Sequence, residues 1–243
     1  MPKHALLNNV DHKHLRVITA RGAAYGDAVM SALTFPAEFR ELQASYPIVF
    51  AQSADGASFD ALALFGFERG ENLFLEERDG AAHWDAPAIP LSVERQPFLI
   101  GRGDELSVHV DLDHPRVSSS EGEAVFLTYG GSSEYLERIA SILRTLHDGL
   151  QAAQGFTAAL VELELLESFV LDVELDNGAR HRLEGFYTIN EERLAALAPE
   201  QLTRLHGAGY LQPVYMALAS LSQFRGLIDR RNRAMAQDDA ARR

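Results

Sequence analysis

Hydrophobic and polar residues alternate most regularly between residues 169 and 175. Apolar side chains occupy every second position of this stretch, and acidic side chains stand among the residues between them. A period of two is the pattern of a half-buried strand, because successive side chains of a strand point to opposite faces. The pair Asn177-Gly178 follows, and it tolerates the positive φ angles of a tight turn. We therefore predict a β-hairpin in which residues 180–187 return as the partner strand.

A helix is predicted to begin directly after this hairpin. Thr188 and Glu191 stand three residues apart, which is the spacing of a capping box. Asn190 is an alternative cap, with two acids in the first turn behind it. The sequence leaves both caps open, and either one starts a helix that runs to about Leu197.

A longer helical pattern occupies residues 134–153, after Ser132 and Ser133, which can cap it. Its apolar residues recur at steps of three and four, so they lie along one face of a helix. These residues are Leu136, Ile139, Leu143, Leu146 and Leu150. Gly155 is predicted to end this helix, and residues 156–166 are predicted to form a second one.

The C-terminal part of the chain is predicted to be helical as well. Residues 199–206 form one segment, which a glycine-rich stretch ends. Residues 213–232 carry an apolar stripe and are predicted to form one long helix. The tail at 234–243 is polar and is predicted to fray.

Short strand patterns separated by turn residues fill the first half of the chain. These segments are 28–35, 48–50, 61–65, 72–75, 98–100 and 106–111, with a short helix at 36–43. Strands this short and this closely spaced predict an antiparallel or mixed sheet. The chain is therefore expected to be an α+β protein, an antiparallel-rich or mixed sheet with C-terminal helices packed on it.

One domain is expected over residues 1–233, followed by the polar tail at 234–243. The hairpin after Glu167 needs a sheet to pack on, because an isolated hairpin is marginally stable in water. Gly130-Gly131 marks a candidate subdomain boundary near residue 130, since the strand-rich pattern gives way there to a helical one.

The net charge of −13 argues against nucleic-acid binding, because phosphate recognition needs clustered lysines and arginines. No segment approaches the roughly 20 apolar residues of a membrane helix, so no membrane insertion is expected. The N-terminal residues contain no apolar run of signal-peptide length. We therefore expect a cytoplasmic protein by default, and surface association by another route stays open. The absence of cysteine excludes disulfides and thiolate chemistry.

His109 and Asp111 have the spacing of two ligands of a non-haem iron site. Residues two apart on a strand point to one side, so both could meet one metal ion. His147 is a candidate third ligand, and His181 and His206 are alternatives to it. The competing interpretation is a polar strand face that ends in a turn, and the pattern favours it. We therefore predict no cofactor, and iron or zinc held by this set is the alternative.

Arg95 stands beside a rigid Pro-aromatic corner, Pro97-Phe98, which suits carboxylate binding by a guanidinium group. Together with Arg116 and Glu68 it is a candidate edge of a binding pocket. The competing interpretation is an arginine that ties a loop to backbone carbonyls or to a glutamate.

The chain also resembles a known family over nearly its whole length. The segments that carry the resemblance are LNNVDHKHLRV, LTFPAEFRELQASYPIVF, GFERGENLFL, ERQPFLIG, VHVDLDHPRVS with EGEAVF, and LLESFVLDVELDNGARHRLEGFYTINEERLAAL. They run in the expected order from about Leu6 to Asn232 and are similar to the bacterial SapC family. Members of that family often stand beside genes for TonB-dependent receptors, cupin-like oxygenases and flavin-dependent halogenases, and no catalytic residues are established for them. The resemblance implies a compact accessory protein in a surface-linked or uptake-linked pathway.

The leading hypothesis is a non-enzymatic binding or accessory protein of a bacterial surface-layer, uptake or peptide-modifying system. No P-loop, G-x-G-x-x-G or G-x-S-x-G motif is present, so the sequence offers no coherent catalytic set. A protein partner, or a small-molecule or peptide ligand, is expected, and a homo-oligomer is compatible with this. Two alternatives stay open. One is a metal-dependent oxygenase or hydrolase built on His109 and Asp111, and the other is a structural surface-layer subunit.

Overall fold

The computed structural model describes residues 3–53, 56, 58–101 and 107–241. The chain folds into two compact units. The first comprises Met1–Ala28, Leu75–Asp85 and Leu91–Asp148, and the second comprises Val29–Phe74, Ala86–Pro90 and Gly149–Arg243. The single domain over residues 1–233 and the boundary near residue 130 stay predictions.

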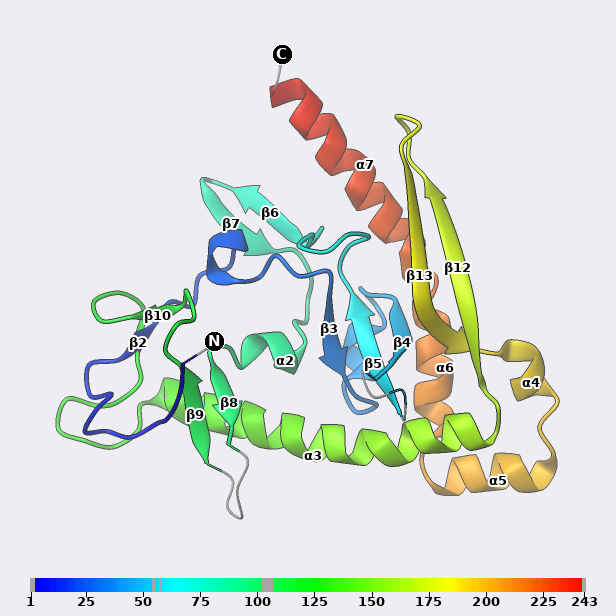
Figure 1. Ribbon diagram of the computed structural model, residues 1–243, viewed down its shortest axis with the longest axis horizontal. Helices are drawn as coiled ribbons and strands as arrows, with labels where there is room; N and C mark the ends of the chain where they lie inside the picture. Colours follow the sequence, from blue (N-terminus) through cyan, green and yellow to red (C-terminus); the bar gives the residue numbers. More distant parts are fainter. Residues whose placement is uncertain (1–2, 54–55, 57, 102–106, 242–243) are drawn as a thin grey trace. The chain divides into compact units, whose positions relative to one another are not determined.

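A five-stranded antiparallel sheet is the framework of the second unit (Figure 1). In spatial order its strands are β12 (Leu166–Glu174), β13 (Arg180–Ile189), β4 (Ile48–Gln52), β5 (Phe59–Leu64) and β3 (Ser31–Thr34). Every neighbouring pair in this sheet is antiparallel. The predicted hairpin therefore has the sheet that its stability requires, and β12 forms one edge of it.

The hairpin of β12 and β13 shows the predicted alternation. Phe169 and Leu171 pack against the core, Val173 is buried, and the residues between them are exposed. The predicted Asn177-Gly178 pair forms the turn, and Gly178 adopts φ 81° there. The alternation did not predict a β-bulge: the register shifts between Phe169 and Leu171, and the partner strand holds an extra residue where Gly185 adopts φ 84°. Glycine accepts that angle without a steric penalty, so it suits a bulge.

The structure decides which residue caps the helix after the hairpin. Asn190 precedes α4 (Glu191–Ala195), and its side-chain oxygen accepts a hydrogen bond from the Arg193 N–H at 2.7 Å. The same side chain donates to a carboxylate oxygen of Glu167 at 2.8 Å. Thr188 lies within β13. Asn190 therefore satisfies a free helical N–H and ties the helix start to β12.

Three helices follow α4, namely α5 (Pro199–Gly207), α6 (Leu211–Ser220) and α7 (Gln223–Ala241). The prediction of one long helix at 213–232 is wrong, because α6 ends at Ser220. The Ser220 hydroxyl donates to the Ala217 carbonyl at 2.6 Å, a contact that competes with helical hydrogen bonding. The predicted polar tail is helical over its described residues, since α7 continues to Ala241, and its fraying stays a prediction. The Asn232 side chain, which accepts the Asp176 N–H at 3.1 Å, anchors that helix near its predicted end.

The C-terminal helices pack on the sheet of the second unit, as predicted. Val214 and Ala217 of α6 are buried, and the Ser220 hydroxyl accepts the Ile48 N–H at 2.8 Å. Phe224 of α7 meets Phe169 of β12 edge to face, with 5.9 Å between the ring centroids. Aromatic pairs prefer this geometry, so it fixes α7 against the hairpin.

The helix α3 (Glu134–Glu162) corrects the prediction of two helices separated at Gly155. It belongs to the first unit up to Asp148 and to the second from Gly149 onward. A glycine inside a helix costs about 1 kcal/mol relative to alanine. Complete burial of Phe156 and Leu160 on the same helix outweighs that cost. A Cβ atom at Gly155 would lie 2.6 Å from the Tyr210 hydroxyl, so glycine makes room for that ring.

Two other helical glycines form a matched pair for a stability test. A Cβ atom at Gly149 would lie 2.3 Å from carbons of the Phe35 ring, whereas one at Gly226 would meet nothing closer than 3.9 Å. We expect Gly149→Ala to lower the free energy of unfolding by about 1–3 kcal/mol, because the core must shift. Gly226→Ala should raise it by up to about 1 kcal/mol through helix propensity. Urea denaturation followed by circular dichroism measures both, and a stabilising Gly149→Ala would contradict the close packing.

Short strands form two small sheets and a hairpin in the first unit. One sheet contains β1 (His4–Leu6), β9 (Val108–Asp111) and β8 (Phe98–Ile100), and the other contains β10 (Val117–Ser118), β2 (Arg16–Val17) and β11 (Glu123–Ala124). The hairpin is β6 (Leu75–Arg78) with β7 (Ala81–Trp84), and two short helices are η1 (Ala23–Tyr25) and α2 (Leu91–Glu94). The first half of α3 packs its predicted apolar stripe against Phe98 and Val110 of β8 and β9.

Two predicted segments in the first half of the chain need correction. The strand predicted at 72–75 is wrong, because Asn72 accepts the Phe74 N–H at 3.0 Å in a turn and β6 begins only at Leu75. The helix predicted at 36–43 is reduced to α1 (Phe39–Leu42). The strand at 98–100 is confirmed. The one at 106–111 is confirmed from Val108 on, and Leu106 lies outside the described residues.

The predicted fold class is confirmed: the protein is α+β, with antiparallel sheets and C-terminal helices packed on one of them. Over the residues with described structure, no helix combines the length and the apolar character that crossing a bilayer requires.

Candidate functional site

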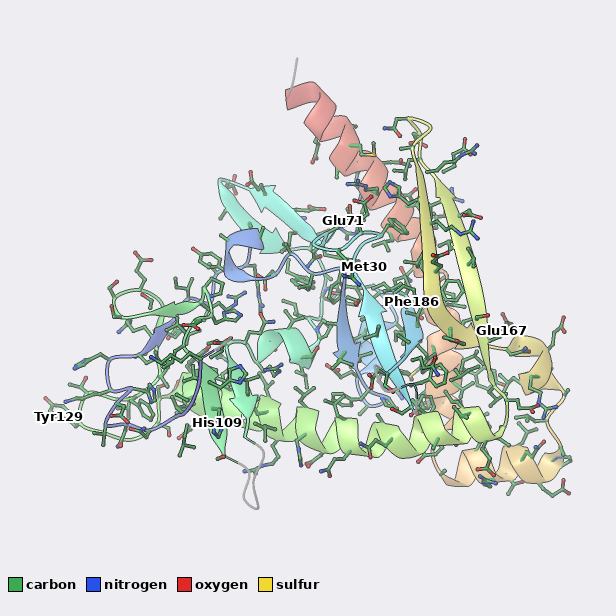
Figure 2. All side chains as sticks on the ribbon, viewed as in Figure 1. Met30, Glu71, His109, Tyr129, Glu167 and Phe186 are labelled. Carbon is green, nitrogen blue, oxygen red and sulfur yellow. The ribbon has the colours of Figure 1, made fainter. Side chains whose placement is uncertain are left out.

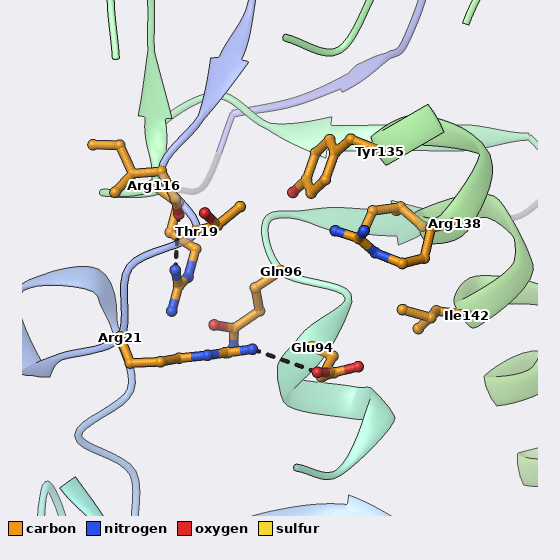
Figure 3. A pocket seen from close by; sticks show the side chains of 10 residues that line it. Thr19, Arg21, Glu94, Gln96, Arg116, Tyr135, Arg138 and Ile142 are labelled. Atoms are coloured by element: carbon orange, nitrogen blue, oxygen red, sulfur yellow. Dashed lines mark hydrogen bonds and ion pairs between the residues drawn. The ribbon is translucent and has the colours of Figure 1, made fainter. Parts of the chain in front are cut away.

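A polar cavity of about 80 Å³ lies in the first unit (Figure 3). Its wall is built from four separate stretches of the chain. The segment after β2 supplies Thr19 and Arg21, and α2 with the residues behind it supplies Glu94 and Gln96. The residue before β10 is Arg116, and the start of α3 supplies Tyr135 and Arg138. Figure 3 shows the α3 side chains reaching this space from one side and Thr19 with Arg116 from the other.

Arg116 forms the rigid wall of this cavity. Its Nη2 lies 2.7 Å from both carboxylate oxygens of Asp27, and its Nη1 donates to the carbonyls of Ile18 and Ala20 at 2.8 and 2.7 Å. Arg116 is 3% exposed and Asp27 is fully buried. A buried guanidinium with this many partners is a structural anchor, because its charge and its donors are already satisfied.

Arg21 is held much more loosely. Its guanidinium nitrogens lie 3.7 Å from Asp27 and 3.6 Å from Glu94. Both distances exceed the 2.7–3.2 Å of a direct N–H···O hydrogen bond. Arg21 can therefore turn its donors toward a group in the cavity without losing a side-chain hydrogen bond to any residue that the structure describes.

Arg138 and Tyr135 offer donors to the same space. The Arg138 guanidinium lies 5.4 Å from the centroid of the Tyr135 ring, a cation–π contact. In the part of the chain that the structure describes, no carboxylate is paired with Arg138. Burial raises the pKa of Tyr135 to about 12, and the neighbouring arginines oppose that rise. The phenol therefore stays protonated at neutral pH and can donate a hydrogen bond.

The charge around the cavity is positive. Three arginines line it against the single carboxylate of Glu94, and the partner of Arg116, Asp27, offsets only one of them. His114 adds no charge near neutral pH. Burial lowers its pKa, Arg116 lowers it further, and its Nδ1 accepts the Arg116 N–H at 3.2 Å. The cavity is thus a local positive site on a chain with a net charge of −13.

The three predicted pocket residues have different surroundings. Arg116 lines the cavity, as described above. The Arg95 guanidinium donates to the Phe98 carbonyl, and burial lowers its pKa. This contact ties Arg95 to a backbone carbonyl of its own loop. It agrees with the alternative to a binding pocket, in which the arginine holds a loop in place. Glu68 belongs to the second unit, where its carboxylate lies 3.0 Å from Nδ1 of His181.

The predicted metal ligands show no convergence. His109, which is labelled in Figure 2, lies on β9 together with Asp111, and His147 lies on α3. His109 packs over Gly101, where a Cβ atom would be 2.2 Å from its ring, and its buried Nδ1 has no hydrogen-bond partner among the described residues. Asp111 accepts the Asp113 N–H at 3.2 Å. Among the described residues, no three His, Asp or Glu side chains are arranged to hold a metal ion, so iron or zinc stays a prediction without geometric support.

A larger groove of about 570 Å³ lies in the second unit, along β3, β5 and the second half of α3. Its wall is mostly apolar and includes the exposed side chains of Leu33 and Val161. Its Glu162 carboxylate is already paired with Arg204, and this pairing lowers the pKa of Glu162. The groove therefore offers fewer unpaired charged groups for ligand recognition than the polar cavity of the first unit.

Sequence reasoning missed Arg21, Glu94, Tyr135 and Arg138. One signal was available for two of them. Tyr135 and Arg138 stand three residues apart at the start of a predicted helix, so they share a face of it. Arg21 and Glu94 come from distant parts of the chain, and only chain folding brings them to the same cavity. Their spacing in the sequence therefore gives no sign of this.

Comparison with protein families gives a match to the SapC model over residues 7–227. The chain belongs to the SapC family. The family match agrees with the order and the extent of the segments that carry the resemblance. The comparisons of this SapC family member with curated proteins and with solved structures give no match.

Proposed function

We propose that this SapC family member is a non-enzymatic binding protein that holds the carboxylate group of a small ligand in the polar cavity of the first unit. The observation that carries the proposal is Arg138, which has no carboxylate partner among the described residues and lines the cavity together with Tyr135 and Thr19. A guanidinium binds a carboxylate with two parallel hydrogen bonds, and such charge-assisted bonds are stronger than neutral ones.

The size of the cavity supports a ligand that enters with one end only. About 80 Å³ has room for a carboxylate and the atoms next to it. The rest of the ligand stays outside the cavity, whose lining includes the exposed residues Arg138 and Thr19. This is the behaviour of a protein that recognises a chemical group on a small molecule or a peptide and leaves the remainder accessible.

An accessory role follows from this proposal together with the family. The binding protein would present or retain its ligand for a neighbouring surface-layer, uptake or peptide-modifying system. The proposal includes no catalytic step, because the role given to the donors at the cavity is to bind and orient a carboxylate.

Acetate and acetamide test the proposal, since they have nearly the same shape and differ in charge. We expect acetate to shift the NMR signals of residues around the cavity at millimolar concentrations, and acetamide to leave them unchanged. Arg138→Gln should weaken acetate binding about tenfold or more, because a hydrogen bond to a charged group contributes about 1.5–3 kcal/mol.

The control is Arg144→Gln, which removes an exposed arginine of α3 that does not line the cavity. It should change the acetate affinity by less than about twofold. Equal shifts with acetate and acetamide, or equal losses in the two variants, would contradict a carboxylate site at Arg138.

A further inference from the structure

Glu94 faces the same cavity as the arginines. It is the last residue of α2, its side chain is 36% exposed, and its carboxylate lies 3.6 Å from the Arg21 guanidinium (Figure 3). At that distance the contact is an ion pair without a direct hydrogen bond. Within the described residues, no other group is bonded to the Glu94 carboxylate. Its oxygens are therefore available to a donor that enters the cavity.

A lone carboxylate is a poor fit to a site of this composition. An anion held by Arg138 would lie in the cavity that Glu94 also lines, and like charges repel at short range. A dianion such as phosphate would meet more of this repulsion. A cationic group next to the carboxylate of the ligand removes the conflict, because it can donate to Glu94.

We infer that the ligand of this cavity is an α-amino carboxylate, with its carboxylate on Arg138 and Tyr135 and its ammonium group on Glu94. This inference rests on the proposed carboxylate site. The volume of about 80 Å³ agrees with it, since the two charged groups of an amino acid are attached to one carbon atom. The side chain of the amino acid points out of the cavity. A peptide C-terminus has an amide in place of the ammonium group and is expected to bind more weakly.

Glycine and acetate separate the two steps of this reasoning, because they differ by the ammonium group alone. We expect the wild-type protein to bind glycine about fivefold more tightly than acetate in NMR titrations at one ionic strength. Glycinamide, which keeps the ammonium group and loses the carboxylate, should not bind. In Glu94→Gln the preference for glycine should disappear, and acetate should bind more tightly than it does to the wild type.

The matched control is Glu137→Gln, which removes the same charge from an exposed position of α3 outside the cavity. It should keep the preference for glycine. Acetate binding at least as tight as glycine binding in the wild type would overturn the amino-acid inference. If Arg138→Gln still weakened both ligands, the carboxylate site would stand. Absence of binding by both ligands would overturn the inference and the proposed function together.

Discussion

Replacing Arg116 by methionine is expected to lower the free energy of unfolding by about 3–5 kcal/mol. The substitution keeps the apolar stem and removes the guanidinium, so the fully buried Asp27 carboxylate loses the two short hydrogen bonds that it accepts from Arg116. The carbonyls of Ile18 and Ala20 lose their donor as well. The cost arises mainly from the buried oxygens that lose these hydrogen bonds, because a buried ion pair by itself contributes little net stability.

The single tryptophan, Trp84, lies in β7 of the same unit, so its fluorescence during urea denaturation reports the change. The control is Arg78→Met. Arg78 is 55% exposed and is paired with Glu76 and Asp85, and exposed pairs contribute little because solvent screens them. We expect its denaturation midpoint to stay close to that of the wild type. A loss below about 1 kcal/mol in Arg116→Met would show that the Asp27 site tolerates the missing charge.

Replacing Phe156 by alanine is expected to cost about 3–5 kcal/mol in the second unit. The ring is fully buried and meets Phe39 and Tyr210 edge to face, with centroid distances of 6.1 and 5.5 Å. A third ring, Phe50 of β4, lies 6.3 Å away. Removal of a side chain with three aromatic neighbours leaves a cavity that they can fill only in part, so both transfer energy and contacts are lost.

Thermal and urea unfolding followed by circular dichroism at the helix band measures this loss. Tyr215→Ala is the control, since Tyr215 is also an aromatic residue in a helix of the second unit but is 54% exposed. It should change the free energy of unfolding by less than about 0.5 kcal/mol. Similar effects of the two substitutions would mean that the aromatic cluster around Phe156 is not the core of that unit.

Local patterns in the sequence predicted the elements whose stability is local. The alternation at 169–175 and the Asn-Gly pair predicted the β12–β13 hairpin, because period and turn chemistry are properties of a few consecutive residues. The acidic residues around 190 predicted a helix start but allowed two caps. The choice of Asn190 came from Glu167, a residue on the preceding strand.

Helix ends were predicted less well, since packing overrides propensity there. Gly155 lies inside α3 because Phe156 and Leu160 are buried around it, and α6 ends at Ser220 because that hydroxyl bonds to Ala217 and Ile48. Neither effect depends on the residues immediately next to the break alone. Each one also involves partners that are distant in the sequence: Phe39 and Tyr210 pack around Phe156, and the Ile48 N–H donates to Ser220.

The sequence by itself determined the α+β class, the hairpin, the apolar face of α3 and the family. It also pointed to Arg116 as a residue of a binding pocket. Only the tertiary structure decided that Arg116 is an anchor satisfied by Asp27, and that Arg21, Glu94 and Arg138 surround one cavity. The physical reason is that periodicity records which face of an element is buried. The recognition of a ligand depends instead on which charged groups from distant segments meet and which of them lack a partner.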